Sequence, residues 1–214
     1  MSGCLEAIVL DCDGVILESV DVKTRAFAST VKRLGPQAVE ILLDYHRSHG
    51  GVSRFEKYRH LWRELYGREI DEQTLARLGE AFAAACFEGV MRAPFVPGAE
   101  AFILAARERW PLYVASGTPE DELRQIFDTR GLTGLFQGVY GSPRTKADLL
   151  ARIIAEHDYA PSRTLMVGDS VTDLAAARAA GSMFYGRGEF PDQPSAADLT
   201  GLMDFIDGLP CPGS

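Results

Sequence analysis

Four short polar segments carry the side chains of this sequence that could do chemistry together. The first reads Asp11-Cys12-Asp13-Gly14 and places two carboxylates two positions apart. Such a pair can share a cation, or one carboxylate can attack an electrophile while the other moves a proton. Because aspartate and glycine are also ordinary turn residues, this segment alone equally fits a solvated turn.

A second acidic segment, residues 168–173, has the sequence GDSVTD. Its Asp169 can join the first carboxylates in an oxygen cage for Mg²⁺, an ion that prefers a few carboxylates together with water and substrate oxygens. Asp173 can support that cage. It can also be the acidic residue that the helix macrodipole favours at a helix N-terminus, and the two roles are compatible.

The remaining two segments carry hydroxyl and cationic groups. Segment 116–119 (SGTP) offers hydroxyls and free backbone N–H groups at an expected helix start, which suits an anion and equally suits a plain N-cap. Segment 142–146 (SPRTK) holds Arg144 and Lys146. Either cation could neutralise a phosphoryl oxygen or keep a nucleophilic carboxylate ionised, so the choice between them stays open.

Each segment follows an apolar run, and these runs are typical of parallel strands covered on both faces. The expected strands are Ala7–Leu10, Leu112–Ala115, Val139–Tyr140 and Leu165–Val167. Helical patterns lie between or after them, at Ala99–Arg109, Glu120–Thr129, Ala147–His157 and Asp173–Ala180. This alternation predicts an α/β fold with a doubly wound, Rossmann-like parallel sheet, in which ligands bind beyond the carboxyl ends of the strands.

The alternation stops in residues 19–93, which show helical patterns only. The expected helices there are Val22–Leu34, Ala38–Ser48, Arg54–Tyr66 and Asp71–Glu88. The proline-rich segment 93–98 then returns the chain to the α/β pattern. We therefore predict a core domain made of residues 1–18 and 94–214, with a helical domain of residues 19–93 inserted after the first strand.

Composition limits the classes of partner. The chain has 214 residues, with 22 Lys and Arg against 30 Asp and Glu, which gives a net charge of −8. This acidic balance argues against nucleic acid or an anionic membrane as partner. No apolar run approaches the ~18 residues that cross a bilayer, and no basic segment suggests a signal peptide. The four scattered cysteines suit reduced thiols, so we expect a cytoplasmic protein.

In this order on successive strand ends, the four segments resemble the motifs of the haloacid dehalogenase superfamily of phosphotransferases. The resemblance covers essentially the whole chain. It implies that Asp11 is a nucleophile that forms an aspartyl-phosphate and that Asp13 is a general acid and base. It also implies Mg²⁺ as cofactor, held by the carboxylates of Asp11 and Asp169 and by the backbone carbonyl of Asp13. Asp173 would support the metal shell and Lys146.

For the substrate, the same resemblance implies that Ser116 and Gly117, with Thr118 in the same segment, hold the phosphoryl group opposite Lys146. The usual Lys-Pro pair of the third motif is absent, so Arg144 remains the alternative cation. The inserted helices resemble the type 1 cap of the superfamily.

In that cap, segment 51–54 (GVSR) resembles the specificity loop of β-phosphoglucomutases. We expect Arg54 to bind a carboxylate or a second phosphate on the leaving group. The alternative is that Arg54 is a solvated residue at a helix start.

The function we expect is that of a Mg²⁺-dependent phosphatase for a small phosphorylated metabolite, similar to phosphoglycolate phosphatases. A sugar phosphomutase of the β-phosphoglucomutase type is the second candidate. Gly168 stands against it, because those mutases tend to carry an acidic residue at that position. A catalytically silent binding protein on the same fold is the third, although Asp11, Asp13 and Asp169 are all present. The presence of Asp13 argues against the dehalogenase branch.

Overall fold

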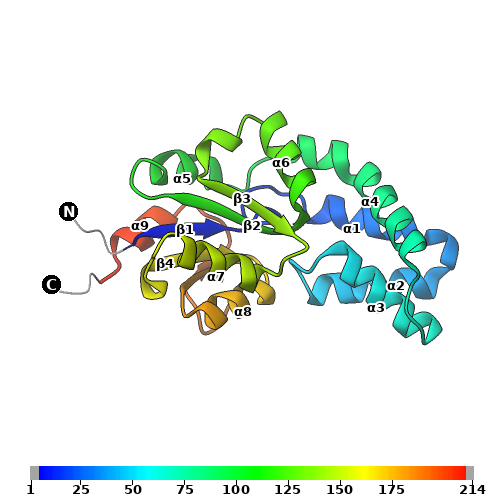
Figure 1. Cartoon of the computed structure of the whole chain (residues 1–214). Coiled ribbons are helices and arrows are strands. Elements are labelled where there is room, and N and C mark those ends of the chain that lie inside the picture. Colours follow the sequence, from blue (N-terminus) through cyan, green and yellow to red (C-terminus); the bar gives the residue numbers. More distant parts are fainter. Residues whose placement is uncertain (1–4, 211–214) are drawn as a thin grey trace.

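The computed structural model describes residues 5–210 and contains a six-stranded parallel sheet in the order β3-β2-β1-β4-β5-β6 (Figure 1). Its strands are β1 (Ala7–Leu10), β2 (Leu112–Pro119), β3 (Gly138–Ser142), β4 (Thr164–Gly168), β5 (Met183–Arg187) and β6 (Ser195–Ala196). Every pairing within this sheet is parallel. The predicted doubly wound α/β fold is confirmed, and β1 lies at the point where the strand order reverses.

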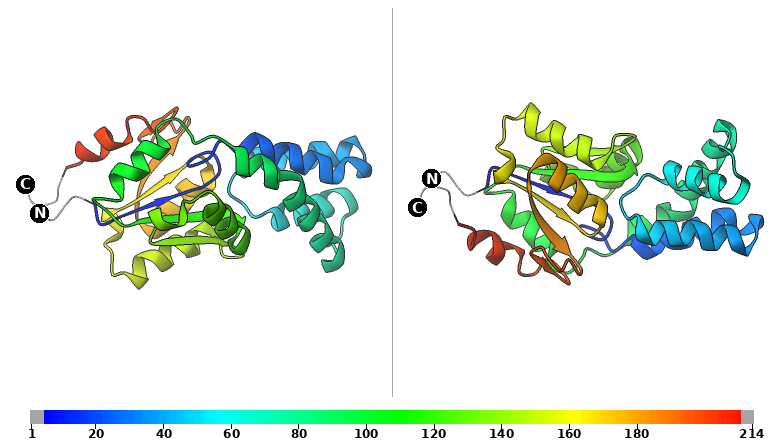
Figure 2. Two further views of the ribbon diagram at one scale, coloured as in Figure 1. Left: turned by 90° about the horizontal axis from the view of Figure 1, so that it is seen from above. Right: turned by 90° about the horizontal axis from the view of Figure 1, so that it is seen from below.

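Helices cover both faces of the sheet, which explains the unbroken apolar character of β1. Ile8 and Leu10 belong to one buried cluster, and Ala7 and Val9 to the other, because successive side chains of a strand alternate between faces. The core helices are α5 (Ala99–Ala106), α6 (Glu120–Thr129), α7 (Lys146–Glu156), α8 (Val171–Ala180) and α9 (Leu202–Asp207). Helices α5, α6 and α9 pack on the first face, and α7 and α8 on the second (Figure 2).

Several elements differ from the expectation. Strand β2 continues past Ala115 to Pro119, with an irregular register between these two residues. Strands β5 and β6 and helix α9 were not predicted, because they are short and mix polar residues with apolar ones. Helix α5 ends at Ala106, three residues earlier than expected, where the charged residues 107–109 follow.

Four helices are inserted between β1 and α5, and we call them the cap. They are α1 (Val20–Val31), α2 (Pro36–Ser48), α3 (Arg54–Tyr66) and α4 (Glu72–Arg92), with a 3-10 turn after α1 at Lys32–Leu34. They lie beyond the carboxyl ends of the strands (Figure 1). Aromatic packing holds them together, since the Phe27 ring lies 4.3 Å from that of Phe82 and 5.7 Å from that of Tyr58. The predicted helical insertion is thus confirmed, while the exact domain limits stay a prediction.

The chain crosses between core and cap twice, and the two crossings are bonded to each other. The Glu18 N–H donates to the Pro94 carbonyl at 2.9 Å, and the Val96 N–H donates to the Ile16 carbonyl at 3.0 Å. Leu17 forms an antiparallel bridge with Phe95 between them. The cap is therefore joined to the core by a two-stranded connection.

Two further observations concern membrane-spanning helices and the cysteines. No helix in residues 5–210 is long and apolar enough to span a membrane. Cys12 and Cys86 are buried free thiols, and the other two cysteines, Cys4 and Cys211, lie outside the described residues.

Candidate active site

Asp11 stands directly after β1 and is 2% exposed. One of its carboxylate oxygens accepts the Cys12 N–H at 2.6 Å. The turn that follows needs a glycine, because Gly14 has a φ of +76° and a Cβ there would lie 2.0 Å from the Asp169 carboxylate. The sequence Asp-x-Asp-Gly thus lets the first and last polar segments approach each other.

Lys146 is the cation that the structure brings to Asp11. It is the first residue of α7, fixed there by a capping box between Thr145 and Asp148. Its Nζ donates to Asp11 Oδ2 and to Asp173 Oδ1, both at 2.6 Å. Arg144, the alternative left open by the sequence, is exposed and does not line the cavity described below.

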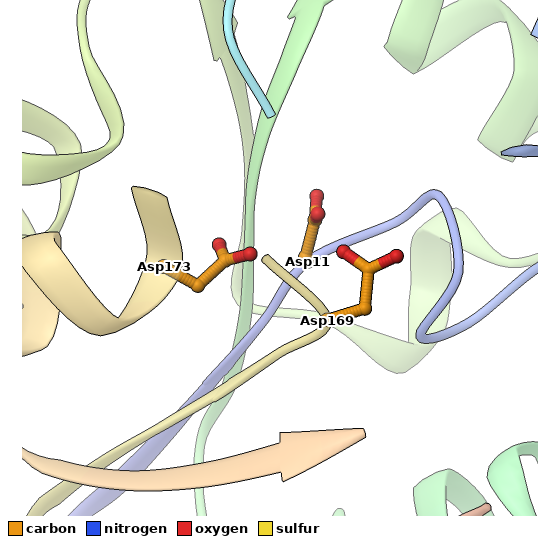
Figure 3. A group of neighbouring side chains, drawn as sticks. All are labelled: Asp11, Asp169 and Asp173. Carbon is orange, nitrogen blue, oxygen red and sulfur yellow. The ribbon is translucent and has the colours of Figure 1, made fainter. Parts of the chain in front are cut away.

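Asp169 and Asp173 complete a group of three carboxylates with Asp11. Each of the three offers an oxygen within 4.8 Å of the other two, and they converge from different elements (Figure 3). Asp173 Oδ2 also accepts the Ser170 N–H at 3.2 Å and the Ser170 hydroxyl in a capping box of α8. Asp173 therefore both caps a helix and holds Lys146, as the sequence allowed.

Burial and mutual repulsion dominate the electrostatics of this group. Burial raises the pKa of Asp11 well above its usual value, against the lowering effect of Lys146, and the neighbouring carboxylates add to the rise. The same two causes raise the pKa of Asp169 to about 7. Burial alone would lower the pKa of Lys146, but the three carboxylates around it raise it well above its usual value. The site has more negative charge than Lys146 balances.

A divalent cation fits this excess of carboxylate. The Asp173 oxygens are already occupied by Lys146 and Ser170, whereas the Asp169 carboxylate has no hydrogen-bond or ion-pair partner among the described residues. An oxygen-only donor set suits Mg²⁺. Asp11 and Asp169 are therefore the carboxylates that would hold it, with Asp173 behind them.

The Ser116–Thr118 segment belongs to the end of β2 and not to the first turn of α6. Helix α6 starts at Glu120 without a side-chain cap, so the plain N-cap alternative is not found. The Ser116 hydroxyl accepts the Thr118 N–H at 3.2 Å, and both side chains are buried. Gly117 and Thr118 line the cavity, whereas Ser116 does not. A Cβ at Gly117 would lie 2.2 Å from the Gly51 carbonyl of the cap, so glycine permits this contact.

Lys23 is a site residue that the sequence analysis missed. It comes from α1 of the cap, forms an ion pair with Asp13 and donates to the Thr118 hydroxyl at 2.7 Å. The Ser19 hydroxyl donates to the other Asp13 oxygen at 2.5 Å. Burial would raise the pKa of Asp13, but Lys23 and Ser19 lower it below its usual value. A single lysine on an amphipathic helix gives no sequence signal of this role.

The structure excludes one of the two alternatives for Arg54. It is the first residue of α3 and is 5% exposed, so it is not a solvated helix start. Its guanidinium forms a 2.8 Å ion pair with Glu122 of α6 and lies 4.5 Å from the Phe82 ring centroid. Arg54 lines the cavity, but its charge is already paired across the core and the cap.

A cavity of about 490 Å³ lies between the strand ends and the cap. From the core it is lined by Asp11, Asp13, Gly117, Thr118 and Asp169, and from the cap by Lys23, Phe27, His46, Arg54, Lys57 and Phe82, among others. The cap loop 50–52 closes one edge, where the Thr172 hydroxyl donates to the Gly50 carbonyl at 2.5 Å. The carboxylates of Asp11 and Asp169 thus line the core side of this cavity, and Lys146 is bonded to Asp11 behind it.

Known proteins are similar to this chain in sequence or in fold. The phosphoglycolate phosphatase of Rhodospirillum rubrum is 28% identical over 240 residues, covering 97% of this chain and 93% of the relative. The crystal structure of CbbY from Rhodobacter sphaeroides in complex with phosphate superposes with a TM-score of 0.74 at 21% identity, covering 95% of this chain and 99% of that one. A predicted phosphatase from Clostridium acetobutylicum gives a TM-score of 0.76 at 17% identity, covering 96% and 99%.

The family assignment rests on the sequence. The model of the haloacid dehalogenase-like hydrolases, described as a hydrolase family, matches residues 5–181. This range includes all four polar segments and the whole cap. The resemblance inferred from the motifs is confirmed, and the chain belongs to the haloacid dehalogenase-like hydrolase family.

Proposed function

We propose that the protein is a Mg²⁺-dependent phosphatase that hydrolyses a small phosphorylated metabolite through an aspartyl-phosphate intermediate. The observation that carries this proposal is the buried Asp11 carboxylate, bonded to Lys146 and facing the cavity beside Asp169. The relative named phosphoglycolate phosphatase and the neighbour crystallised with phosphate support it.

In the first step, an Asp11 oxygen attacks the phosphorus atom in line, and the bond from phosphorus to the leaving oxygen breaks. Asp13 donates a proton to that oxygen, which leaves as an alcohol. In the second step, Asp13 takes a proton from water, the resulting hydroxide attacks the phosphorus, and inorganic phosphate leaves as Asp11 is regenerated. Lys146 balances the charge of the phosphoryl oxygens in both steps.

The metal and the cap complete this scheme. Mg²⁺, held by Asp11 and Asp169, would supply positive charge to the phosphoryl group. The ion pair with Lys23 favours the ionised form of Asp13, which is the form needed to activate water.

The experiment is turnover of p-nitrophenyl phosphate with Mg²⁺ and with EDTA. We expect hydrolysis that requires Mg²⁺. Activity that appears only with a sugar bisphosphate primer would instead identify a phosphomutase, the candidate suggested by loop 51–54. Absence of turnover on a panel of phosphorylated metabolites, with or without primer, would reject both enzymes and leave a binding protein.

We also propose that the enzyme works in the cytoplasm on small molecules and not on nucleic acid. The buried free thiols of Cys12 and Cys86 are compatible with a reducing compartment. The net charge of −8 disfavours a phosphate backbone as ligand.

A further inference from the structure

The cap side of the cavity carries positive charges and no carboxylate. The cations that line it from the cap are Lys23, Arg47, Arg54 and Lys57. Three of them form ion pairs with carboxylates, and Lys57 is the exception. In the part of the chain that the structure describes, no carboxylate oxygen lies within 4.0 Å of the Lys57 ammonium.

A directed chain of hydrogen bonds fixes the position of Lys57. The Thr24 hydroxyl donates to the Val20 carbonyl at 2.9 Å, so it must accept from His46 Nε2, which lies 3.0 Å away. This leaves His46 Nδ1 as the acceptor for Lys57 Nζ at 2.8 Å. Burial and the charge of Lys57 lower the pKa of His46 to about 3, which keeps the ring neutral. An ammonium has three N–H groups, and the hydrogen bond to His46 uses one of them.

The surroundings of the ammonium leave its charge uncompensated. Lys57 is 3% exposed, and its Nζ lies 5.4 Å from the centroid of the Phe27 ring. A buried cation that contacts a neutral imidazole and an aromatic ring, and on which Lys23 and Asp13 act with opposite sign, is costly unless an anion completes its surroundings. Burial, followed by the charge of Lys23, lowers the pKa of Lys57 to about 7, which reflects the same deficit. No carboxylate of the described cap fills it, but the adjoining cavity is open to a ligand.

We propose that Lys57, positioned by His46, binds a second anionic group carried by the leaving group of the substrate, either a carboxylate or a phosphate. This inference rests on the proposed phosphatase function and narrows its substrates to phosphate monoesters of small alcohols that bear one further anion. We assign this role to Lys57 in place of Arg54, because the charge of Arg54 is paired with Glu122 and that of Lys57 is not paired with any carboxylate of the described residues. Lys57 and Asp11 line the same cavity, so one small molecule can meet both.

The test is equilibrium binding of three phosphonates that differ only at the end remote from phosphorus. They are 3-phosphonopropanoate, 1,2-ethanediphosphonate and propylphosphonate, with a carboxylate, a second phosphonate and a methyl group at that end. Isothermal titration calorimetry with Mg²⁺ is run on the wild type, on Lys57→Met and on Lys32→Met. Lys32 is an exposed lysine of the cap and controls for the loss of one positive charge.

We expect the wild type and Lys32→Met to bind one of the two doubly anionic ligands about 10- to 100-fold more tightly than propylphosphonate. Lys57→Met should lose this preference while its affinity for propylphosphonate changes less than about threefold. If 3-phosphonopropanoate binds more tightly, the second anionic group of the substrate is a carboxylate. If 1,2-ethanediphosphonate binds more tightly, it is a phosphate. Equal binding of all three by the wild type, or a preference that survives in Lys57→Met, would overturn the inference. Lys57→Gln gives a second test if Lys57→Met does not fold.

Turnover separates this inference from the proposed function. The esters tested are phosphoglycolate, ethylene glycol bisphosphate and ethyl phosphate. Lys57→Met should reduce kcat/KM about 10- to 100-fold for the preferred anionic ester and by a much smaller factor for p-nitrophenyl phosphate, which offers no second anion. If no ester is hydrolysed, the phosphatase proposal fails, and the phosphonate titrations still decide whether Lys57 binds the second anion.

Discussion

Two buried lysines, one on the core side of the site and one on the cap side of the cavity, have surroundings that are opposite in charge. Lys146, from the core, is bonded to the carboxylates of Asp11 and Asp173, which raise its pKa. Lys57, from the cap, is bonded to a neutral histidine, and burial together with Lys23 lowers its pKa to about 7. The core end therefore holds its charges in place before any substrate binds. The cap end lacks an anion, and we infer that the substrate supplies it.

The largest expected effect concerns the core end. Asp11→Asn should reduce turnover of every phosphate ester by about 10⁴-fold or more, because an amide cannot replace a carboxylate nucleophile. The measurement is steady-state kcat with Mg²⁺ on p-nitrophenyl phosphate and on an alkyl ester, with circular dichroism to confirm folding. A folded variant within tenfold of wild type would remove Asp11 from the proposed mechanism.

Replacing each lysine should change the free energy of unfolding by a different amount. Lys146→Met leaves two carboxylates buried without their cation and should cost about 3–5 kcal/mol in the free energy of unfolding. Lys57→Met removes an uncompensated charge and should cause little loss, or a gain, at pH 7. Urea denaturation of both variants measures this difference. Equal destabilisation would contradict the contrast between the two surroundings.

The lowered pKa of Lys57 also leads us to expect a change of stability with pH. Its pKa is about 7 in the folded protein against 10.5 ordinarily, so the unfolded chain takes up the proton first as the pH falls. The stability of Lys57→Met relative to wild type should therefore grow as the pH falls from about 10.5 to about 7, and stay constant below that. The neighbouring His46, with a pKa of about 3, does not titrate in this range.

Mg²⁺ should stabilise the core end, where carboxylates outnumber cations. At about a hundredfold excess over Kd, a ligand of the native state adds about 2.7 kcal/mol to the free energy of unfolding. Thermal unfolding with Mg²⁺ and with EDTA should show this increase, and Asp169→Asn should largely abolish it. A wild-type melting temperature that is the same in Mg²⁺ and EDTA would argue against the metal site.

The smallest expected effect concerns Arg54 and Glu122, which join the cap to the core. Arg54→Gln and Glu122→Gln should each raise KM a few-fold for charged and neutral esters alike, and the double variant should be no worse than either single one. A selective loss on anionic esters in Arg54→Gln would instead restore Arg54 as the residue that binds the leaving group.

The sequence was most informative where backbone position alone determines a residue's surroundings. Asp11 and Asp169 could be placed together because each directly follows a buried strand, and parallel strands end at one edge of the sheet. The choice of Lys146 over Arg144 was also within reach. The Thr-x-x-Asp capping box at Thr145 starts α7 at Lys146, a signal that the sequence analysis did not use.

The cap could not be predicted at the same level, because its side chains meet through packing between helices. Lys23, His46 and Lys57 come from α1, α2 and α3, and their contacts depend on how these three helices lie against one another. Helical periodicity predicts that the helices exist and does not predict their relative rotation. The pairing of Arg54 with Glu122 depends further on how the cap sits on the core.

The bonded pair of crossings between core and cap has a mechanical consequence. Two independent tethers would let the cap twist and slide, but segments 16–18 and 94–96 are joined by hydrogen bonds, so we expect them to bend together as one hinge. Lys23 and Lys57 lie on the same side of that hinge, so one rotation carries both toward the core. The movement that pairs Lys23 with Asp13 would therefore also carry Lys57 toward the leaving group, so that the two contacts form together.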